Sequence, residues 1–410
     1  MTRRLPGRRP ADPVVAALVR SQLARQVSRR SVLAAGAGSA GVAALLAACG
    51  TGGTPAAGPS GPVEDRSDEE KQVRWANWTL YLDYDEDAGT YPTLERFTEQ
   101  TGIEVTYAED IEDNDAYFGK VQGQLANGQD IGQDIVTLTD WMAGRLIRLG
   151  YTQELDQANI PNAANLLADL RDVSFDPGRA HSLTWQSGFG GVAWSTSAVP
   201  GGIRTVSDLW APELKGRVEV LSEMRDTVGL IMLEQGVDVA GDWGDDEFFA
   251  ALDVLEEQIT SGQIRQVKGN SYVEDLVSGD ALAVIGWSGD ITSLNAENGE
   301  GWEFALPEAG GTLWSDNLMI PVGSPHKANA EALMDYYYDP AVAAEVAAYV
   351  SYICPVEGAR EAMEQIDPAL AENPLIFPDD AWLSRSSVFR ALDPEEETRY
   401  NDAFQTVIGN

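Results

Sequence analysis

Short apolar runs alternate with stretches of helical spacing along most of the chain. The first apolar runs, rich in β-branched and aromatic residues, lie at 73–78, 103–107 and 135–138, and helical spacing occurs at 91–100, 116–126 and 141–149. Strands that alternate with helices are typical of a sheet covered by helices. The pattern therefore predicts an α/β fold that begins near residue 73.

The same alternation occurs a second time further along the chain. Its strand candidates are 192–195, 218–221 and 281–286, and its helix candidates are 227–235, 246–259 and 271–277. A later strand at 318–322, followed by helices at 328–338 and 340–350, indicates that the chain returns to its first half. We therefore expect two lobes, each a mixed sheet flanked by helices. Their predicted ranges are 73–190 plus 315–362 for lobe 1, and 191–314 plus 363–410 for lobe 2.

The first 48 residues differ in charge from the rest of the chain. They hold eight of the 28 basic residues and one of the 65 acidic residues. The pair Arg29 and Arg30 precedes an apolar run at 34–48, which is too short and too rich in small residues to span a bilayer. This order is typical of a twin-arginine export signal. We therefore predict that residues 1–48 are a signal peptide.

The apolar run ends in a sequence that resembles a bacterial lipobox, Leu46-Ala47-Ala48-Cys49. In such a sequence the cysteine carries lipid after cleavage, so Cys49 is predicted to be a lipid anchor. Residues 49–72 are rich in Gly, Pro, Ser and Thr, which predicts a flexible tether. We expect an exported protein on the outer face of the cytoplasmic membrane, at the cell surface or in the periplasm. An ordinary thiol behind a non-lipoprotein signal is the alternative.

Charge and residue counts exclude several classes of function. The formal net charge of -37 repels phosphate backbones, which excludes nucleic acid as the main partner. The two cysteines, Cys49 and Cys354, have neither disulfide-framework nor zinc-site spacing, and two histidines offer little for an imidazole-based hydrolase. The acids at 83–87 lack the glycine and glutamate of a calcium loop, so they predict a solvated acidic rim. We expect no cofactor and no metal.

Three tryptophans stand where an apolar run gives way to polar or small residues. They are Trp78, Trp287 and Trp314, and Asp290 and Asp316 follow the last two within three residues. Ligands of open α/β sheets bind outside the carboxyl ends of strands, so these aromatic side chains are expected to face one crevice. An aromatic face attracts a cation and a carboxylate accepts its N–H donors. The combination predicts a site for an alkyl ammonium ligand.

Six sequence motifs occur in order between residue 73 and the C-terminus: Asn77-Trp78-Thr79-x-Tyr81, Phe97-Thr98-Glu99-Gln100-Thr101-Gly102-Ile103-Glu104-Val105, Gln133-Asp134-Ile135-Val136, Ser207-Asp208-Leu209-Trp210-x-Pro212-Glu213-x-Lys215-Gly216, Gly286-Trp287-x-Gly289-Asp290 and Pro307-Glu308-x-Gly310-Gly311-x-x-Trp314-x-Asp316. With these motifs the chain resembles the solute-binding lipoproteins of spermidine and putrescine ABC importers. The resemblance implies a two-lobed periplasmic-binding-protein fold of type II, with the ligand cleft between lobes that close like a hinged trap.

The resemblance also implies a set of ligand-binding residues. They are Trp78, Thr79, Tyr81, Thr139, Trp141, Glu223, Trp287, Asp290, Trp314, Asp316 and Tyr352. Two positions depart from the family pattern. Leu80 stands where members usually have an acid, and the amide expected in spermidine-type members is absent around 382–384. The choice between a diamine, a triamine and another cationic amine therefore stays open.

The interpretation that follows is a binding protein without catalytic residues. It is expected to capture a polyamine of the putrescine or spermidine class, as a monomer, and to deliver it to ABC permease subunits. Its alternatives are a binding protein for another small cationic amine and a secreted hydrolase that uses paired acids such as Asp290 and Asp316. A hydrolase would need one carboxyl of raised pKa and room for an attacking water.

Overall fold

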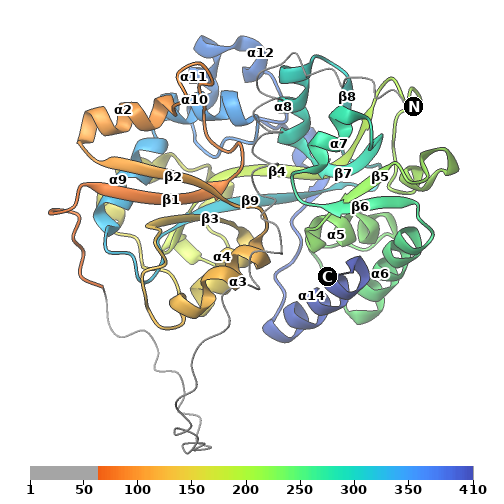
Figure 1. The fold of residues 1–410 in the computed structure, drawn as a ribbon, viewed down its shortest axis with the longest axis horizontal. Helices are drawn as coiled ribbons and strands as arrows, with labels where there is room; N and C mark the ends of the chain where they lie inside the picture. The colour runs from red at the N-terminus through yellow and green to blue at the C-terminus, as the bar shows by residue number, and fades with distance from the viewer. Residues whose placement is uncertain (1–62, 410) are drawn as a thin grey trace, which may run out of the picture. The chain divides into compact units, whose positions relative to one another are not determined.

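A ten-stranded mixed sheet runs through the computed structural model, which describes residues 63–409. Eight strands follow one path in the order β2-β1-β3-β9-β4-β7-β5-β6 (Figure 1). In addition, β8 pairs with β4 and β10 with β9. The strands are β1 Gln72–Trp78, β2 Glu104–Ile111, β3 Ile135–Thr139, β4 Ser182–Ser195, β5 Val218–Leu221, β6 Ile264–Lys268, β7 Ala283–Trp287, β8 Trp302–Ala305, β9 Gly311–Met319 and β10 Ser386–Ser387.

Helices cover both faces of this sheet, and several short 3-10 turns lie between residues 157 and 214 (Figure 1). The α-helices are α2 Pro92–Thr101, α3 Asn114–Leu125, α4 Asp140–Arg148, α5 Met224–Glu234, α6 Asp245–Thr260, α7 Tyr272–Ser278, α8 Ser288–Asn298, α9 Lys327–Tyr337, α10 Pro340–Val350, α11 Ala359–Ile366, α12 Pro368–Ala371, α13 Asp380–Leu383 and α14 Pro394–Ile408. None of the helices within 63–409 is both long and apolar enough to cross a membrane.

Two separate groups of buried side chains divide the sheet into two lobes. The core around β1–β3 and α9–α10 contains Trp75, Phe97 and Trp185, and we call the part built on it lobe 1. The core around β5–β7, α5 and α6 contains Phe248 and Tyr400, and we call that part lobe 2. The chain is thus an α/β protein with two lobes, as the sequence predicts.

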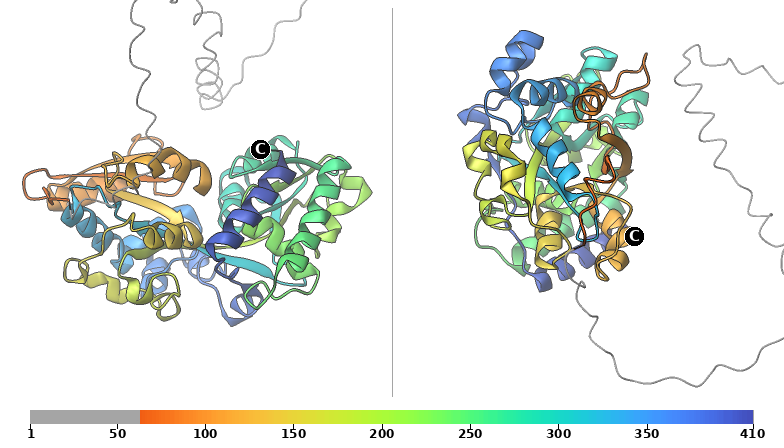
Figure 2. Two further views of the ribbon diagram at one scale, coloured as in Figure 1. Left: turned by 90° about the horizontal axis from the view of Figure 1, so that it is seen from below. Right: turned by 90° about the vertical axis from the view of Figure 1, so that its left-hand side faces the viewer.

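Strands β4 and β9 pass through both lobes. At one end of β4, Leu183 pairs with Leu318 of β9, which also pairs with β3 of lobe 1. At its other end, Val192 pairs with Ile285 of β7 in lobe 2. The backbone of β4 and of β9 therefore connects the two lobes covalently (Figure 2). Any movement of one lobe relative to the other has to bend these two strands.

Most predicted elements are observed within a few residues, and three regions differ. Strand β4 begins ten residues before the predicted 192–195, and β9 begins at Gly311 instead of 318. Residues 363–376 were expected in lobe 2, but Met363, Ala371 and Ile376 pack in the core of lobe 1, because α11 and α12 follow α10 directly.

The end of the predicted tether is also fastened to lobe 1. Ser67 is buried, and its Oγ accepts a hydrogen bond of 3.1 Å from the backbone N–H of Asn329 in the first turn of α9. Asp65 accepts the N–H of Ala328 at 3.1 Å, and Glu70 lies 2.9 Å from Nε2 of the buried His326. Ordered structure therefore begins before residue 73. Cys49 and residues 1–48 lie outside the described residues.

Candidate functional site

The Asp316 carboxylate is held by two hydroxyl groups from lobe 1. Tyr81 Oη donates to Oδ2 at 3.0 Å, and Thr139 Oγ1 donates to Oδ1 at 2.7 Å. Asp316 pairs with Thr139 across β9 and β3, which brings two residues 177 positions apart into contact. Its side chain is only 4% exposed. Asp316 and Trp314 lie inside β9 and not at a strand end, contrary to the expectation from the apolar pattern.

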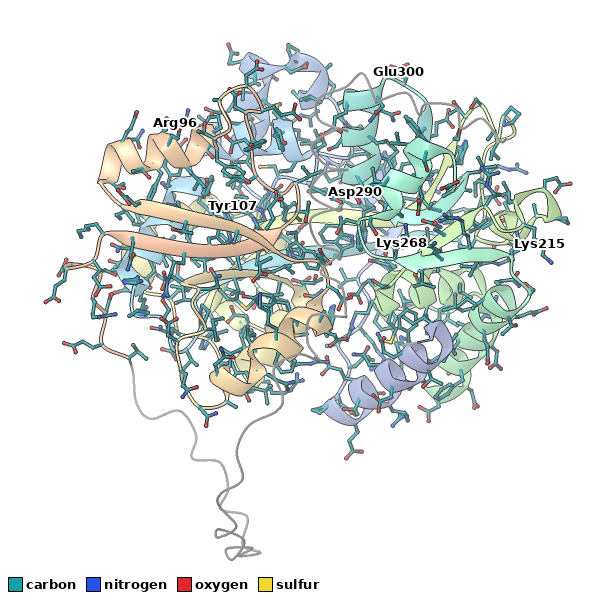
Figure 3. The ribbon with its side chains drawn as sticks, in the orientation of Figure 1. Arg96, Tyr107, Lys215, Lys268, Asp290 and Glu300 are labelled. Atoms are coloured by element: carbon teal, nitrogen blue, oxygen red, sulfur yellow. The ribbon has the colours of Figure 1, made fainter. Side chains whose placement is uncertain are left out.

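A second carboxylate, Asp290, lies in the first turn of α8 near the middle of the molecule (Figure 3). Tyr352 Oη donates to its Oδ1 at 2.7 Å, while Tyr272 Oη and Asn270 Nδ2 donate to Oδ2 at 2.9 and 3.2 Å. Tyr272 also accepts the backbone N–H of Trp287 at 2.9 Å. One buried tyrosine therefore fixes both the carboxylate and the neighbouring tryptophan.

A third carboxylate, Asp226, was not among the predicted site residues. Its Oδ2 accepts the indole N–H of Trp287 at 2.8 Å, and its Oδ1 accepts the hydroxyl of Thr312. Asp226 is 4% exposed in the first turn of α5. A sequence signal was available, because an acid that precedes the apolar run 228–233 is unusual on a helix that faces a core.

Aromatic rings connect these carboxylates. The ring of Trp314 lies 6.3 Å from that of Trp287 and 5.3 Å from that of Tyr352, and Tyr352 lies 5.5 Å from Tyr81. Trp287 packs against the cores of both lobes. The indole N–H of Trp314 is buried and has no partner among the described residues. These aromatic side chains and Asp226, Asp290 and Asp316 form one group at the junction of the lobes, which we call the aromatic–acid cluster.

Glycines of β4 make room for this cluster. A Cβ on Gly188 would lie 2.5 Å from Trp314 Cζ2 and 2.9 Å from Tyr352 Cδ1. A Cβ on Gly190 would collide with Thr312 and lie 2.6 Å from Asp226 Oδ1. Side chains at these positions would displace the aromatic ring or the carboxylate, so glycine is required by close approach. The same glycines interrupt the strand pattern, which explains why the start of β4 was not predicted.

Trp78 ends β1 beside the lobe 1 core, and Thr79 and Leu80 follow it in a turn. Trp78 is partly buried and its indole N–H has no partner among the described residues, while Thr79 is exposed. Leu80 is 57% exposed with φ at 56°, a left-handed conformation that costs a non-glycine residue about 1–2 kcal/mol. Glu109 accepts its backbone N–H at 2.9 Å, which stabilises this turn. The structure does not bring Thr79 into hydrogen-bonding contact with the aromatic–acid cluster.

Glu223 and Trp141 lie around an arginine that the sequence analysis did not consider. Oε1 of Glu223 is 3.7 Å from Nη1 of Arg225, and the Arg225 guanidinium stacks on the Trp141 ring at 4.0 Å. Glu223 also caps α5 by accepting the Arg225 backbone N–H. Burial raises the pKa of the Glu223 carboxyl to about 8, although the nearby Arg225 lowers it, and Trp141 already has a cation on its ring. Of the eleven predicted residues, these two belong to a separate group.

Burial dominates the electrostatics of the cluster. It raises the pKa of the Asp316 carboxyl to about 7, although the hydrogen bonds from Thr139 and Tyr81 lower it. Burial likewise raises the pKa of Asp226 and of Asp290. Within the described part of the chain, none of the three forms an ion pair with Lys, Arg or His. A ligand that supplied positive charge would remove this desolvation penalty.

Metal binding at the acidic loop has no structural support. Asp83 is buried and accepts both the N–H and the hydroxyl of Thr93, and Asp85 accepts the N–H of Ala88 at 2.9 Å. These acids therefore stabilise turns. Across residues 63–409, no group of three or more His, Cys, Asp and Glu side chains is arranged to hold a metal ion.

Comparison with known proteins gives a consistent picture. Residues 93–378, more than half of the chain, match the model of a family described as bacterial extracellular solute-binding protein. The spermidine/putrescine-binding periplasmic protein of Escherichia coli K12 is 26% identical over 305 residues, which cover 74% of this chain and 82% of that protein. A putrescine/agmatine-binding protein of Pseudomonas aeruginosa is 26% identical over 326 residues, which cover 74% and 84%.

Solved structures support the same fold. A putative spermidine/putrescine ABC transporter protein from Listeria monocytogenes superposes with a TM-score of 0.72 and 23% identity. The match covers 82% of this chain and 99% of that one. At this identity the likeness concerns the fold alone.

Proposed function

Because the chain belongs to the family of bacterial extracellular solute-binding proteins, we propose that it captures a small cationic amine of the polyamine class and delivers it to an ABC permease. The curated relatives named for spermidine, putrescine and agmatine support this ligand class. In this proposal the protein is a monomer without catalytic activity, and its ligand lies at the aromatic–acid cluster.

The observation that carries the proposal is the charge of the cluster. Asp226, Asp290 and Asp316 accept hydrogen bonds from neutral donors only, and burial penalises their ionised forms. An anionic or neutral ligand would add no compensating charge, whereas ammonium groups would pair with the carboxylates. The rings of Trp287, Trp314 and Tyr352 can cover the alkyl chain between two such groups and attract the cations.

Ligand charge provides the direct test. Putrescine carries an ammonium group at each end, while N-acetylputrescine keeps one. We expect acetylation to weaken binding at least about tenfold, close to 1.4 kcal/mol, in isothermal titration calorimetry of the exported domain. Maltose and glutamate serve as controls and should not bind. Equal affinity for both amines, or saturable sugar binding, would contradict the proposal, and hydrolysis of the N-acetylputrescine amide to acetate and putrescine would favour the hydrolase alternative.

Affinity should depend on pH through Asp316. Its pKa of about 7 means that the carboxyl of the ligand-free protein becomes protonated as the pH falls below 7, and a bound cation then has to displace that proton. A diamine stays fully protonated in this range, because alkyl ammonium groups titrate near pH 10. We expect the dissociation constant for putrescine to rise by about tenfold between pH 8 and pH 6. Calorimetry at both pH values would measure it, and a flat profile would contradict the role of Asp316.

The proposal includes export and lipid anchoring through Cys49. Cys49→Ser should release the exported protein in soluble form, because no lipid can be attached without the thiol. Membrane and soluble fractions of expressing cells, probed with antibody, measure the change. Arg29→Lys with Arg30→Lys is the companion variant, in which full-length precursor should stay in the cytoplasm. Continued membrane attachment of Cys49→Ser would contradict the anchor.

A further inference from the structure

Helix α14 presents different faces to the two lobes. Tyr400 is completely buried in the lobe 2 core, where its ring stacks on Phe248 at 4.1 Å. Glu397 and Asn401 lie one turn apart on another face of the helix and contact α4 and α3 of lobe 1. In the left view of Figure 2, α14 runs along the side of lobe 2 that faces lobe 1. The helix is therefore fixed to one lobe and touches the other.

The Glu397 carboxylate is surrounded by three arginines from both lobes. Oε2 lies 3.0 Å from Nη2 of Arg148, and Oε1 lies 3.3 Å from Nη2 of Arg145, both on α4 of lobe 1. Oε1 also lies 3.5 Å from Nη2 of Arg225, on α5 of lobe 2. Glu397 is 6% exposed. Its charge therefore joins guanidinium groups of opposite lobes, with Glu397 and Arg225 buried and Arg148 43% exposed.

A second contact between α14 and lobe 1 lies one turn further along the helix, at Asn401. Asn401 donates to Asp115 at 2.9 Å, and Arg145 donates to the other oxygen of Asp115 at 2.8 Å. The same helix borders a groove of about 1130 Å³ along its whole length, from Pro394 to Ile408, opposite Phe118 of α3. Glu397 and Asn401 line this groove and join the lobes across it.

Removing the carboxylate would leave two like charges close together. The guanidinium groups of Arg225 and Arg145 lie 4.0 and 4.9 Å from the ring of Trp141, so one indole carries a cation from each lobe. Glu397 contacts both and offsets their mutual repulsion. Without it, Asp115 and Glu223 would remain beside Arg145 and Arg225, but the positive charge that Glu397 offsets would be left over and would push α4 away from α5.

We propose that Glu397 is a positioning residue for ligand capture, which favours the closed arrangement of the lobes without contacting the ligand. The ion pairs of Glu397 with Arg145, Arg148 and Arg225 are called the bridge. The inference rests on the proposed function, because it assigns the bridge a role in ligand binding at the aromatic–acid cluster. Arg225 connects the two: it contacts Glu397 and directly precedes Asp226, which holds Trp287 of the aromatic–acid cluster. Closing the bridge and orienting the cluster are therefore coupled at the start of α5.

Glu397→Gln in the exported domain tests the proposal. Small-angle scattering of the ligand-free variant should give a larger radius of gyration than the parent, and saturating putrescine should restore the parent value. The dissociation constant for putrescine should rise at least about tenfold, through faster dissociation with little change in association rate. Glu395→Gln is the matched control, since it removes an exposed acid from the same turn and should change neither quantity.

A second variant, Arg148→Gln, distinguishes the proposed role of Glu397 from a purely structural one. Arg148→Gln leaves the contacts within lobe 2 intact and should still weaken binding, and a double-mutant cycle of Arg148 with Glu397 should give a coupled effect. A lower melting temperature with unchanged affinity, or additive effects in the cycle, would overturn the proposal. If the parent protein binds no amine, the proposed function fails, while scattering of the ligand-free variants still tests the bridge.

Discussion

Asp316→Asn should abolish most of the affinity for a diamine, with a loss of about 2–5 kcal/mol, the range for truncating one partner of a desolvated charge pair. The variant keeps the shape of the side chain, and the hydroxyls of Tyr81 and Thr139 can still hydrogen-bond to the amide. The loss would therefore come from the missing charge. Calorimetric titration with putrescine at pH 8 measures it.

The thermal stability of Asp316→Asn distinguishes a loss of affinity from misfolding of the variant. Burial disfavours the ionised Asp316, so its uncharged variant should be at least as stable as the parent at pH 8 when no ligand is present. Glu331→Gln is the control, because Glu331 is also buried in lobe 1 but lies outside the aromatic–acid cluster. Its carboxylate accepts hydrogen bonds from the backbone N–H of Asp156 and the side chain of Asn159, and it pairs with Lys327. It should lower the melting temperature and leave affinity unchanged. Parent-like binding by Asp316→Asn would mean that the ligand lies elsewhere.

Trp287→Ala should weaken diamine binding by about 1–3 kcal/mol, because it removes an aromatic face and its buried area. The indole also donates to Asp226 and packs against both cores, so its loss leaves that carboxylate with one donor fewer. Fluorescence or calorimetric titration measures the affinity. Trp302→Ala is a matched control: Trp302 is partly buried in lobe 2, and no hydrogen bond joins its side chain to the cluster. If both variants bind amine equally well, the cluster is not the ligand site.

The sequence predicted the parts of the fold that depend on local pattern. Strands such as 218–221 and helices such as 340–350 match closely, because their apolar spacing reflects one buried face. The first ten residues of β4 were not predicted to be a strand. Gly188 and Gly190 occur there because side chains of other segments approach the backbone closely at these two positions. Spacing along one strand carries no record of such crowding.

The sequence predicted several residues of the candidate site, but it did not predict which partners their side chains contact. Asp290, Asp316, Trp287 and Trp314 come together at the lobe junction, but Asp226 was not among the predicted site residues. Glu223 was predicted to bind the ligand, because nothing in the sequence indicates that its carboxylate lies beside Arg225. Partners of this kind are set by tertiary packing, which a linear pattern does not encode.

The crossing of β4 and β9 also sets the order in which the chain can fold. Lobe 2 is built largely from the segment between these strands, whereas the lobe 1 sheet joins β3 to β9 across 177 residues. Closing so long a loop is entropically costly, and contacts between distant segments form slowly. During synthesis, lobe 1 therefore stays incomplete, with one edge of β3 unpaired, until almost all of lobe 2 has been made. The slowest folding step should be the docking of β9, which assembles Asp316 with Thr139 and so completes the cluster and the lobe together.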